Sequence, residues 1–508
     1  ANTTGTQNVA VGSSAGDAMT TANNNVTVGH NSMGANTTGS SNVAVGAAAL
    51  AANTTAGSNT AVGNGALTAN TIGFNNTAVG ANSLDANVSG DYNVAMGTLA
   101  LTTDASGNKT TAIGYAALYN QNPASGADVF NTAVGYAAGT AVTTGVQNTI
   151  IGAEAGDAIT TGGSNVAVGY NSLSTNIIGA NNTALGKNAL ENTTTNWATA
   201  IGFEALKTQS TGSRNVAVGY QSSVNLTTGV SNTSVGMLSL AANTTGSYNT
   251  AVGELSLDAN TTASNNTAVG YNSLSANTTG HTNTAVGKVA LKAVTTGTDN
   301  VGLGVDAGGG ITTASQNLML GNYSGNHERS GNGSVNICIG HYTDLGTTTS
   351  TRVVAIGYDV TGDTDFTTIG YSTSDIRAAH GTATWAAVSD QRYKKDIADS
   401  TAGLSFINAL QPRTFKYKTL GELPETFRAY EADSTEVYKN SVTNHGFIAQ
   451  EIKAAIDADD SIKDGFKLWD ERSDGSQEVA EAALIPVLTK AIQELSTQLD
   501  AALARITT

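Results

Sequence analysis

A serine and a lysine five positions apart form the pair in this chain best suited to covalent chemistry. Ser389 and Lys394 lie in the segment Ser-Asp-Gln-Arg-Tyr-Lys. A serine hydroxyl needs a base, and a lysine amine serves as that base only where burial lowers its pKa toward neutrality. The hydroxyl of Ser389 can reach the carbonyl of the preceding residue, which would give an ester that water then opens. Spacing alone also fits a chance pair in a charged loop.

Other residue types that bind metals or cofactors lack the spacing that such sites need. The six histidines are scattered, and the single Cys338 rules out an internal disulfide and a Cys-rich zinc site. We expect Cys338 to be a buried packing residue. Asp359, Asp363 and Asp365 favour a polar turn over a calcium site, and the glycine-rich stretch 302–308 lacks the spacing of a dinucleotide fingerprint. The sequence therefore predicts no metal and no cofactor.

Charge divides the 508-residue chain into two unlike parts. The formal net charge is -16, which argues against nucleic acid or an anionic membrane as a partner. Only 9 of the 23 Lys and Arg residues precede Ser389. No apolar run reaches membrane-spanning length and no signal peptide is visible. Because the chain begins in phase with its repeat and without Met, we expect a longer protein from which a targeting or anchoring segment is missing.

A 17-residue repeat fills the first part, with the consensus Asn-x-Ala-Val-Gly-x-x-x-Leu-x-x-Asn-Thr-Thr-Gly-x-x. Its glycine recurs from Gly12 to Gly370, with few changes of spacing. A unit this short suits one coil of a β-solenoid, with a short strand and a turn. Equivalent residues would stack at about 4.8 Å, so the rod would be on the order of 100 Å long.

Each repeat position carries its own expectation. The Asn four residues before the glycine, as at Asn42 and Asn59, is predicted to form a side-chain amide ladder. The residue before the glycine is always apolar and is predicted to face a core, with Ala and Val as the main inward residues. This position holds Val11, Val45, Met96, Ile113, Leu185, Leu320 and Ile369 among others.

One such thin coil buries little, so we expect a homotrimer of packed solenoids. The motif Asn42-Val-Ala-Val-Gly46 resembles the head repeats of trimeric autotransporter adhesins and the repeats of many tail fibres. The adhesin repeat is shorter, which leaves the cross-section open.

Two insertions interrupt the repeat and are candidate receptor loops, because insertions in solenoids form lateral loops. The first spans 119–130 and carries Tyr119, Pro123 and Phe130. The second spans 322–333 and carries His327 and Arg329. The alternative, which the sequence favours, is drift in a tolerant surface loop.

After a connector at 372–388, the residues from 389 to 508 have the composition of a globular α+β domain. A short helix is predicted at 403–410, a strand at 414–418, and a strand turning into a helix at 445–452. The last segment places apolar residues at alternating steps of four and three, which favours a coiled coil. These residues are Leu488, Ile492, Leu495, Leu499, Ala502 and Ile506. The predicted fold is thus mostly β: a solenoid rod over 1–371 and a small α+β domain ending in a helix.

An ordered set of motifs in this second part resembles the intramolecular chaperone domain of phage tail spikes and fibres, the S74 peptidase family. The motifs are Ser389–Ile397, Leu410-Gln-Pro, Phe415-Lys-Tyr417 and Gly446–Glu451. The resemblance implies a domain that drives trimerisation of the preceding fibre and then cuts itself off. It also implies Ser389 as nucleophile, Lys394 as base and Val388-Ser389 as the bond cut. Tyr393 stands where Leu is frequent in that family.

We therefore expect a trimeric tail fibre or receptor-binding protein of a phage or a contractile tail device, with a single-turnover autoproteolytic serine endopeptidase. Its place would be the virion tail or the surface of an extracellular particle. Its partners would be a host cell-surface receptor such as a glycan, and other tail or baseplate proteins through the missing N-terminal region. The alternatives are a bacterial trimeric adhesin with the same chaperone, or a fibre whose chaperone stays uncleaved. A glycan-degrading enzyme would need a carboxylate cluster on the rod, and the sequence offers none.

Overall fold

The computed structural model describes residues 3–326, 332–372, 374–382, 385–387, 389–427, 429–460, 462, 466–473 and 475–507. The chain divides into two compact units, Ala1–Val388 and Ser389–Thr508. The first unit is a β-solenoid and the second is a small α+β domain.

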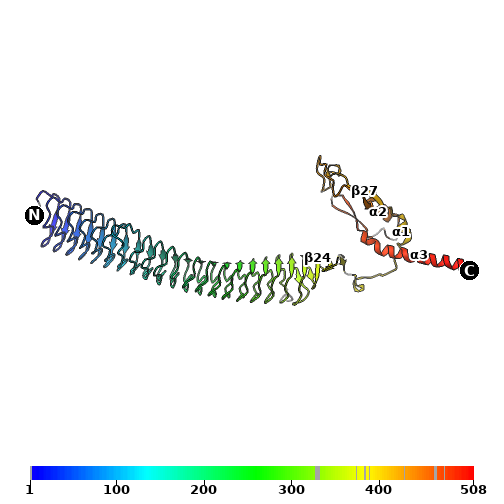
Figure 1. Ribbon diagram of the computed structural model, residues 1–508, viewed down its shortest axis with the longest axis horizontal. Helices are drawn as coiled ribbons and strands as arrows, with labels where there is room; N and C mark the ends of the chain where they lie inside the picture. The colour runs from blue at the N-terminus through cyan, green and yellow to red at the C-terminus, as the bar shows by residue number, and fades with distance from the viewer. Residues whose placement is uncertain are drawn as a thin grey trace. The chain divides into compact units, whose positions relative to one another are not determined.

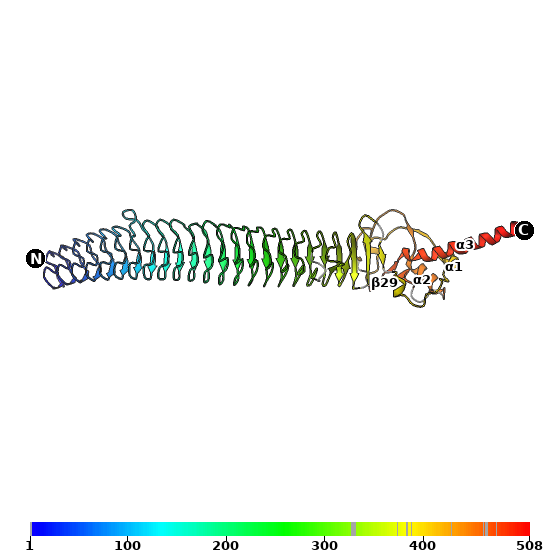
Figure 2. The ribbon, with the colours of Figure 1, turned by 90° about the horizontal axis from the view of Figure 1, so that it is seen from below.

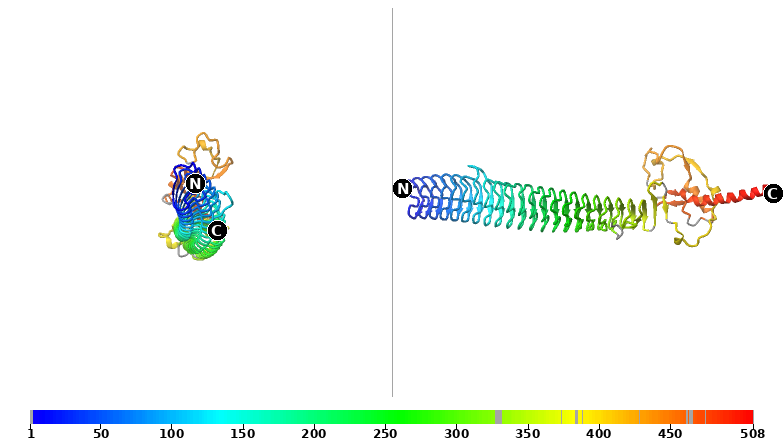
Figure 3. Two further views of the ribbon diagram at one scale, coloured as in Figure 1. Left: turned by 90° about the vertical axis from the view of Figure 1, so that its left-hand side faces the viewer. Right: turned by 60° about the horizontal axis from the view of Figure 1, so that its bottom comes forward.

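Each coil of the first unit contributes one short strand, and equivalent strands pair in parallel along the stack (Figure 1). In β3 and β4, for example, Val43 pairs with Thr60, Ala44 with Ala61 and Val45 with Val62. The end-on view of Figure 3 shows closely similar coils following one another with a gradual displacement. The predicted solenoid of 17-residue repeats is confirmed.

The parallel strands follow the repeat. They are β1 (Val9–Val11), β2 (Val26–Val28), β3 (Val43–Val45), β4 (Thr60–Val62), β5 (Thr77–Val79), β6 (Val94–Met96), β7 (Thr111–Ile113), β8 (Thr132–Val134), β9 (Thr149–Ile151), β10 (Val166–Val168), β11 (Thr183–Leu185), β12 (Thr199–Ile201), β13 (Val216–Val218), β14 (Thr233–Val235), β15 (Thr250–Val252), β16 (Thr267–Val269), β17 (Thr284–Val286), β18 (Val301–Leu303), β19 (Leu318–Leu320), β20 (Ile337–Ile339), β22 (Val354–Tyr358) and β24 (Phe366–Tyr371).

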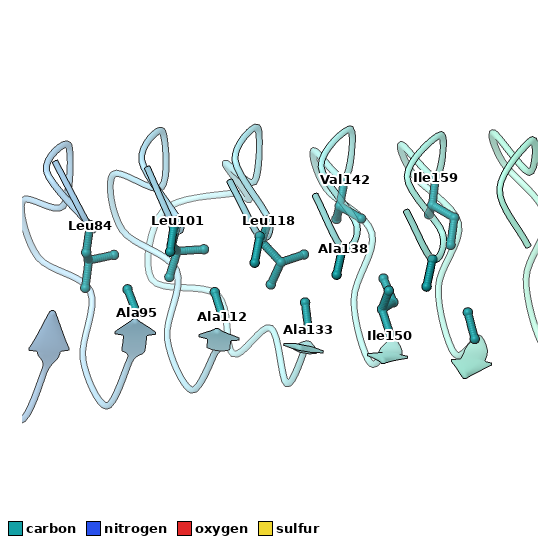
Figure 4. Packing of buried hydrophobic residues seen from close by; sticks show 14 of the residues in the cluster. Leu84, Ala95, Leu101, Ala112, Leu118, Ala133, Ala138, Val142, Ile150 and Ile159 are labelled. Carbon is teal, nitrogen blue, oxygen red and sulfur yellow. The ribbon is translucent and has the colours of Figure 1, made fainter. Parts of the chain in front are cut away.

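The core of each coil is narrow and consists mainly of alanine and leucine. In Figure 4, Ala95 and Ala112 point from their strands toward Leu84, Leu101 and Leu118 on the opposite segment of the coil. All five side chains are fully buried. Successive layers repeat this contact, so the core is continuous along the stack although each coil supplies little of it.

The predicted inward orientation of the residue before the glycine is wrong within one chain. Side chains alternate between the two faces of a strand, so a three-residue strand points only its middle residue inward. That residue is the alanine, as at Ala95, while Met96 beside it is 41% exposed. The same outward orientation leaves Leu185 and Leu320 exposed. The main inward residues are therefore Ala and Leu, and not Ala and Val.

The asparagine ladder is confirmed, and it satisfies backbone groups as well as side chains. Asn76 Oδ1 accepts a hydrogen bond from the backbone N–H of Asn93 at 2.9 Å. The backbone N–H of Asn76 donates in the same way to Asn59 Oδ1 at 2.9 Å. Its amide group donates to the Gly90 carbonyl at 2.8 Å. Each buried Asn thus ties its own coil to the neighbouring coils.

The repeat glycine is fixed by both conformation and contact. Gly169 has φ of +132°, and a Cβ built there would lie 2.6 Å from the carbonyl oxygen of Gly186 in the next coil. Any larger residue would be strained and would force neighbouring coils apart.

Two kinds of coil fill the core in different ways. In the commoner kind, Leu50 fills the core four residues after the glycine, and the residue three further on is the buried Asn53. In the second kind, Gly156 replaces the leucine, and Ile159 replaces the asparagine and fills the same space. The left-handed backbone persists in both, with φ of 51° at Leu50 and 52° at Gly156.

Beyond β24 the sheet continues through the segment predicted as a connector. There β25 (Ser374–Ala379) pairs antiparallel with β24, and β26 (Ala386–Ala387) pairs with β25. A separate parallel pair is formed by β21 (Asp344–Leu345) and β23 (Thr361–Gly362).

The second unit packs three helices around a small core. The helices are α1 (Leu404–Ala409), α2 (Ala449–Asp457) and α3 (Leu484–Thr507), with 3₁₀ turns η1 (Gln391–Tyr393), η2 (Leu420–Glu422) and η3 (Glu481–Ala483). Two antiparallel pairs complete it, β27 (Arg413–Phe415) with β28 (Asn444–Gly446) and β29 (Trp469–Glu471) with β30 (Gln477–Val479). Phe406, Ile452, Ile456, Leu468 and Val487 form the buried cluster.

Candidate functional site

The structure brings Ser389 and Lys394 together at the start of the second unit. Lys394 Nζ donates a hydrogen bond to Ser389 Oγ at 2.7 Å. The turn η1 lies between them and begins after Asp390, whose side chain accepts from the backbone N–H of Arg392 at 2.8 Å. This tight turn returns the chain so that residues five positions apart meet. Val388, the residue before the serine, lies outside the described residues.

A charged pair lies within the same short segment. Arg392 also bonds the Asp390 carboxylate through its guanidinium, which holds the pKa of Asp390 below its usual value. The Asp390 carboxylate is thereby paired with Arg392. Ser389 and Lys394 are both exposed in the single chain, so one chain alone does not supply the burial that a lysine base requires.

The unit that carries this pair has a recognisable family signature. Residues 389–460 match the Peptidase_S74 family model, described as chaperone of endosialidase. The match begins at Ser389 itself. It supports a self-cleaving chaperone domain with peptidase-type activity behind the solenoid. Neither the search of curated proteins nor the search of solved structures gave a match.

Two elements that carry residues of the sequence motifs, β27 and α2, meet within this unit. Arg413 on β27 binds Glu451 on α2 through two hydrogen bonds, of 2.8 and 3.0 Å. Leu410, at the end of α1, is buried in the core. The Arg413–Glu451 pair lowers the pKa of Glu451, but because both side chains are exposed its contribution to stability is small.

The apolar residues of the terminal helix α3 form one broad stripe, of which one part is buried. Leu484, Val487 and Ala491 are buried against the domain. The predicted seam residues lie beside them on the same side of the helix and are exposed: Leu488, Ile492, Leu495, Leu499 and Ile506. The Glu494 carboxylate accepts a hydrogen bond from the Leu404 backbone N–H at 2.8 Å, which ties α3 to the start of α1.

The first candidate receptor loop projects from the stack as the light-blue loop in Figure 2. Phe130 is exposed, Tyr119 is half-buried, and Pro123 is buried over Gly107. Pro123 therefore shapes the loop and does not offer a surface contact. The second loop candidates, His327 and Arg329, lie outside the described residues.

The sequence interpretation missed an aromatic patch next to the first loop. Phe74 and Tyr92 meet edge to face, and Lys109 lies over the Phe130 ring and binds Asp128 at 2.6 Å. The sequence did contain a signal for this aromatic patch. Tyr92 and Phe130 occupy a turn position that usually holds a small polar residue, such as Ser58.

The remaining candidates for chemistry are structural. Cys338 is buried, which raises the pKa of its thiol to about 12. Asp365 binds Arg352, and Asp363 binds Arg377 at 2.7 Å. Among the described residues, no group of three or more His, Cys, Asp or Glu side chains could hold a metal ion. Within the same residues, no helix has the length and hydropathy to cross a membrane.

Proposed function

We propose that this chain is the fibre protein of a phage tail or a contractile tail device, and that residues 389–508 are its intramolecular chaperone. The chaperone assembles three chains through α3 and then cuts the bond between Val388 and Ser389. The single observation that carries the proposal is the 2.7 Å contact between Lys394 Nζ and Ser389 Oγ, at the residue where the family match begins.

The cleavage step uses only groups of this chain and one water molecule. Neutral Lys394 takes the proton of the Ser389 hydroxyl as Oγ attacks the carbonyl carbon of Val388. The bond from that carbon to the Ser389 nitrogen breaks, the nitrogen takes the proton, and an ester forms. Water then opens the ester, which leaves a carboxylate on Val388 and restores the hydroxyl and a free amine on Ser389.

Assembly and cleavage are linked in this proposal by burial. Lys394 is exposed in one chain, whereas its role as a base requires desolvation. A neighbouring copy that covers Lys394 would supply it. Cleavage would then follow completed assembly, and the enzyme would act once.

The assembly step is tested by molar mass under native conditions, from sedimentation of the full chain. The wild type is expected to be a trimer. The triple variant Ile492→Gln, Leu499→Gln, Ile506→Gln removes exposed apolar groups, retains helix propensity and leaves the buried Val487 in place. It is expected to sediment as a monomer. A control, Gln493→Asn with Gln498→Asn, changes exposed polar positions of α3 and should stay trimeric. A monomeric wild type, or a trimeric triple variant, contradicts the proposed role of α3.

A further inference from the structure

One long face of the solenoid carries no charge. This strand face consists of the first and third residues of β1 to β20, which point away from the core. Every one of these residues is Val, Thr, Ile, Leu or Met. The charged side chains of the coils lie instead on turns and return segments. Two examples are Glu204 with Lys207 at 2.7 Å and Lys292 with Asp306 at 2.8 Å.

The strand face is partly exposed in the single chain: most of its side chains are half-buried, and some are exposed. Met96, Leu185, Val286 and Leu320 each leave at least 40% of their surface open to solvent. Water-exposed apolar surface of this kind is unfavourable by about 25 cal/mol per Å². Monomeric proteins rarely expose contiguous apolar patches above a few hundred Å².

The size of the strand face matches that of a stable interface. Twenty strands spaced at about 4.8 Å, each about 10 Å long, give a face of roughly 900 Å². A standard protein interface buries about 800 Å² on each partner. The face is therefore large enough to hold a partner along the rod without help from the rest of the surface.

We propose that the strand face is where the solenoids of neighbouring copies pack against one another. The proposal rests on the proposed function, because copies joined at their C-terminal units run parallel. Parallel copies bring equivalent coils to the same height along the rod. The Val and Thr side chains of one strand face then lie opposite the same residues of the neighbouring copy, at the same spacing. A partner of different sequence would not share this repeat spacing along every coil. The charged turns then remain in water, where the side loops are available for a receptor.

The test compares two cysteine variants in the same coil of the full chain. Val286→Cys lies on the strand face, and Thr279→Cys lies on the preceding turn; both positions are exposed in the single chain. The native Cys338 is buried, with its thiol pKa raised to about 12, so it does not compete for a maleimide. Thr284→Cys, on the same strand face, repeats the measurement with a near-isosteric change.

The rate of maleimide labelling is measured on the native protein, after its molar mass has been determined. We expect labelling of Val286→Cys and Thr284→Cys to be slower than that of Thr279→Cys by at least about tenfold, as for sites that open only by local separation. Equal rates in an assembled trimer overturn the strand-face interface and leave the proposed function intact. A monomeric wild type contradicts the assembly in the proposed function and the interface with it.

Discussion

Lys394 Nζ and Ser389 Oγ lie 2.7 Å apart, although both residues are exposed in the single chain. The contact is close enough for proton transfer. In the proposed mechanism the chemistry therefore waits for a change in surroundings. The mechanism has two requirements: geometry from η1 within one chain, and burial from neighbouring copies.

The first prediction concerns this coupling. The triple variant Ile492→Gln, Leu499→Gln, Ile506→Gln leaves Ser389 and Lys394 unchanged but replaces three of the exposed apolar residues of α3. If burial comes from assembly, the variant should remain uncut while the wild type is cut. A time course on denaturing gels measures this, with the Gln493→Asn, Gln498→Asn variant as control. Rapid cutting of a monomeric triple variant would show that assembly is not required.

The second prediction concerns the link from α3 to α1. Gly403 precedes α1 and has no side chain to cap it, and Glu494 accepts from the Leu404 N–H instead. Glu494→Ala should destabilise the second unit by about 0.5–2 kcal/mol, as the loss of a helix cap does. Glu494→Gln keeps an acceptor oxygen and should lose less. Denaturant unfolding of the second unit measures the loss of stability in both variants. Equal losses of stability would argue against the capping role.

The third prediction uses the two kinds of coil. A Cβ at Gly156 would lie 2.9 Å from Ile159 Cδ1, so Gly156→Leu alone overfills the core and should cost about 1–3 kcal/mol. Adding Ile159→Asn recreates the pairing seen at Leu50 and Asn53 and should recover most of that loss. Thermal unfolding of the single and double variants measures the coupling. Strictly additive losses would contradict it.

The fourth prediction concerns pH. Asp104 lies three residues after Leu101, at the position that Asn53 holds in its coil. Burial raises the pKa of Asp104 despite hydrogen bonds from Gln121, Gly107 and Ser106. A raised pKa means that the folded chain disfavours the charged form. The contribution of Asp104 to stability is therefore greatest below pH 3.8, the ordinary pKa, and is lost as pH rises through the raised value.

Asp104→Asn removes this titration and keeps a polar side chain at the position. The variant should be more stable than the wild type at neutral pH, and the difference should shrink as the pH is lowered toward 3.8. Unfolding measured across this pH range tests the prediction, with Asp91→Asn, at a half-buried position, as control. A difference that does not change with pH would contradict the burial argument.

Much of the solenoid could be predicted from its sequence because its period is explicit. Three features could be predicted: the glycine spacing, the strand at Val43–Val45 and the ladder through Asn42 and Asn59. Each depends on a residue type that recurs at the same position of the repeat. The outward direction of the side chain before the glycine could not be predicted from the sequence. An apolar residue at every copy has the same pattern whether it faces a core within the chain or a surface covered by another chain.

Two other features could not be predicted from local sequence patterns, because they depend on comparing different coils or on contacts between residues far apart in the chain. The exchange of Leu50 with Asn53 for Gly156 with Ile159 is visible in the sequence, but only when two positions are compared between coils. The bond from Glu494 to Leu404 joins residues 90 positions apart, and no local pattern indicates it. The contact between Ser389 and Lys394 depends on a single turn, so proximity within the motif indicated it correctly.

The most direct test of the account is the intact mass of the full chain under denaturing conditions. The variants are Ser389→Ala, which removes the nucleophile, and Lys394→Arg, which keeps the positive charge but cannot act as a base. Lys395→Arg is the matched control at the next residue. The account predicts that the wild type and Lys395→Arg split between Val388 and Ser389, while Ser389→Ala and Lys394→Arg stay whole. A wild type that forms trimers and stays whole would contradict the self-cleaving activity, and cutting in Lys394→Arg would contradict the lysine base.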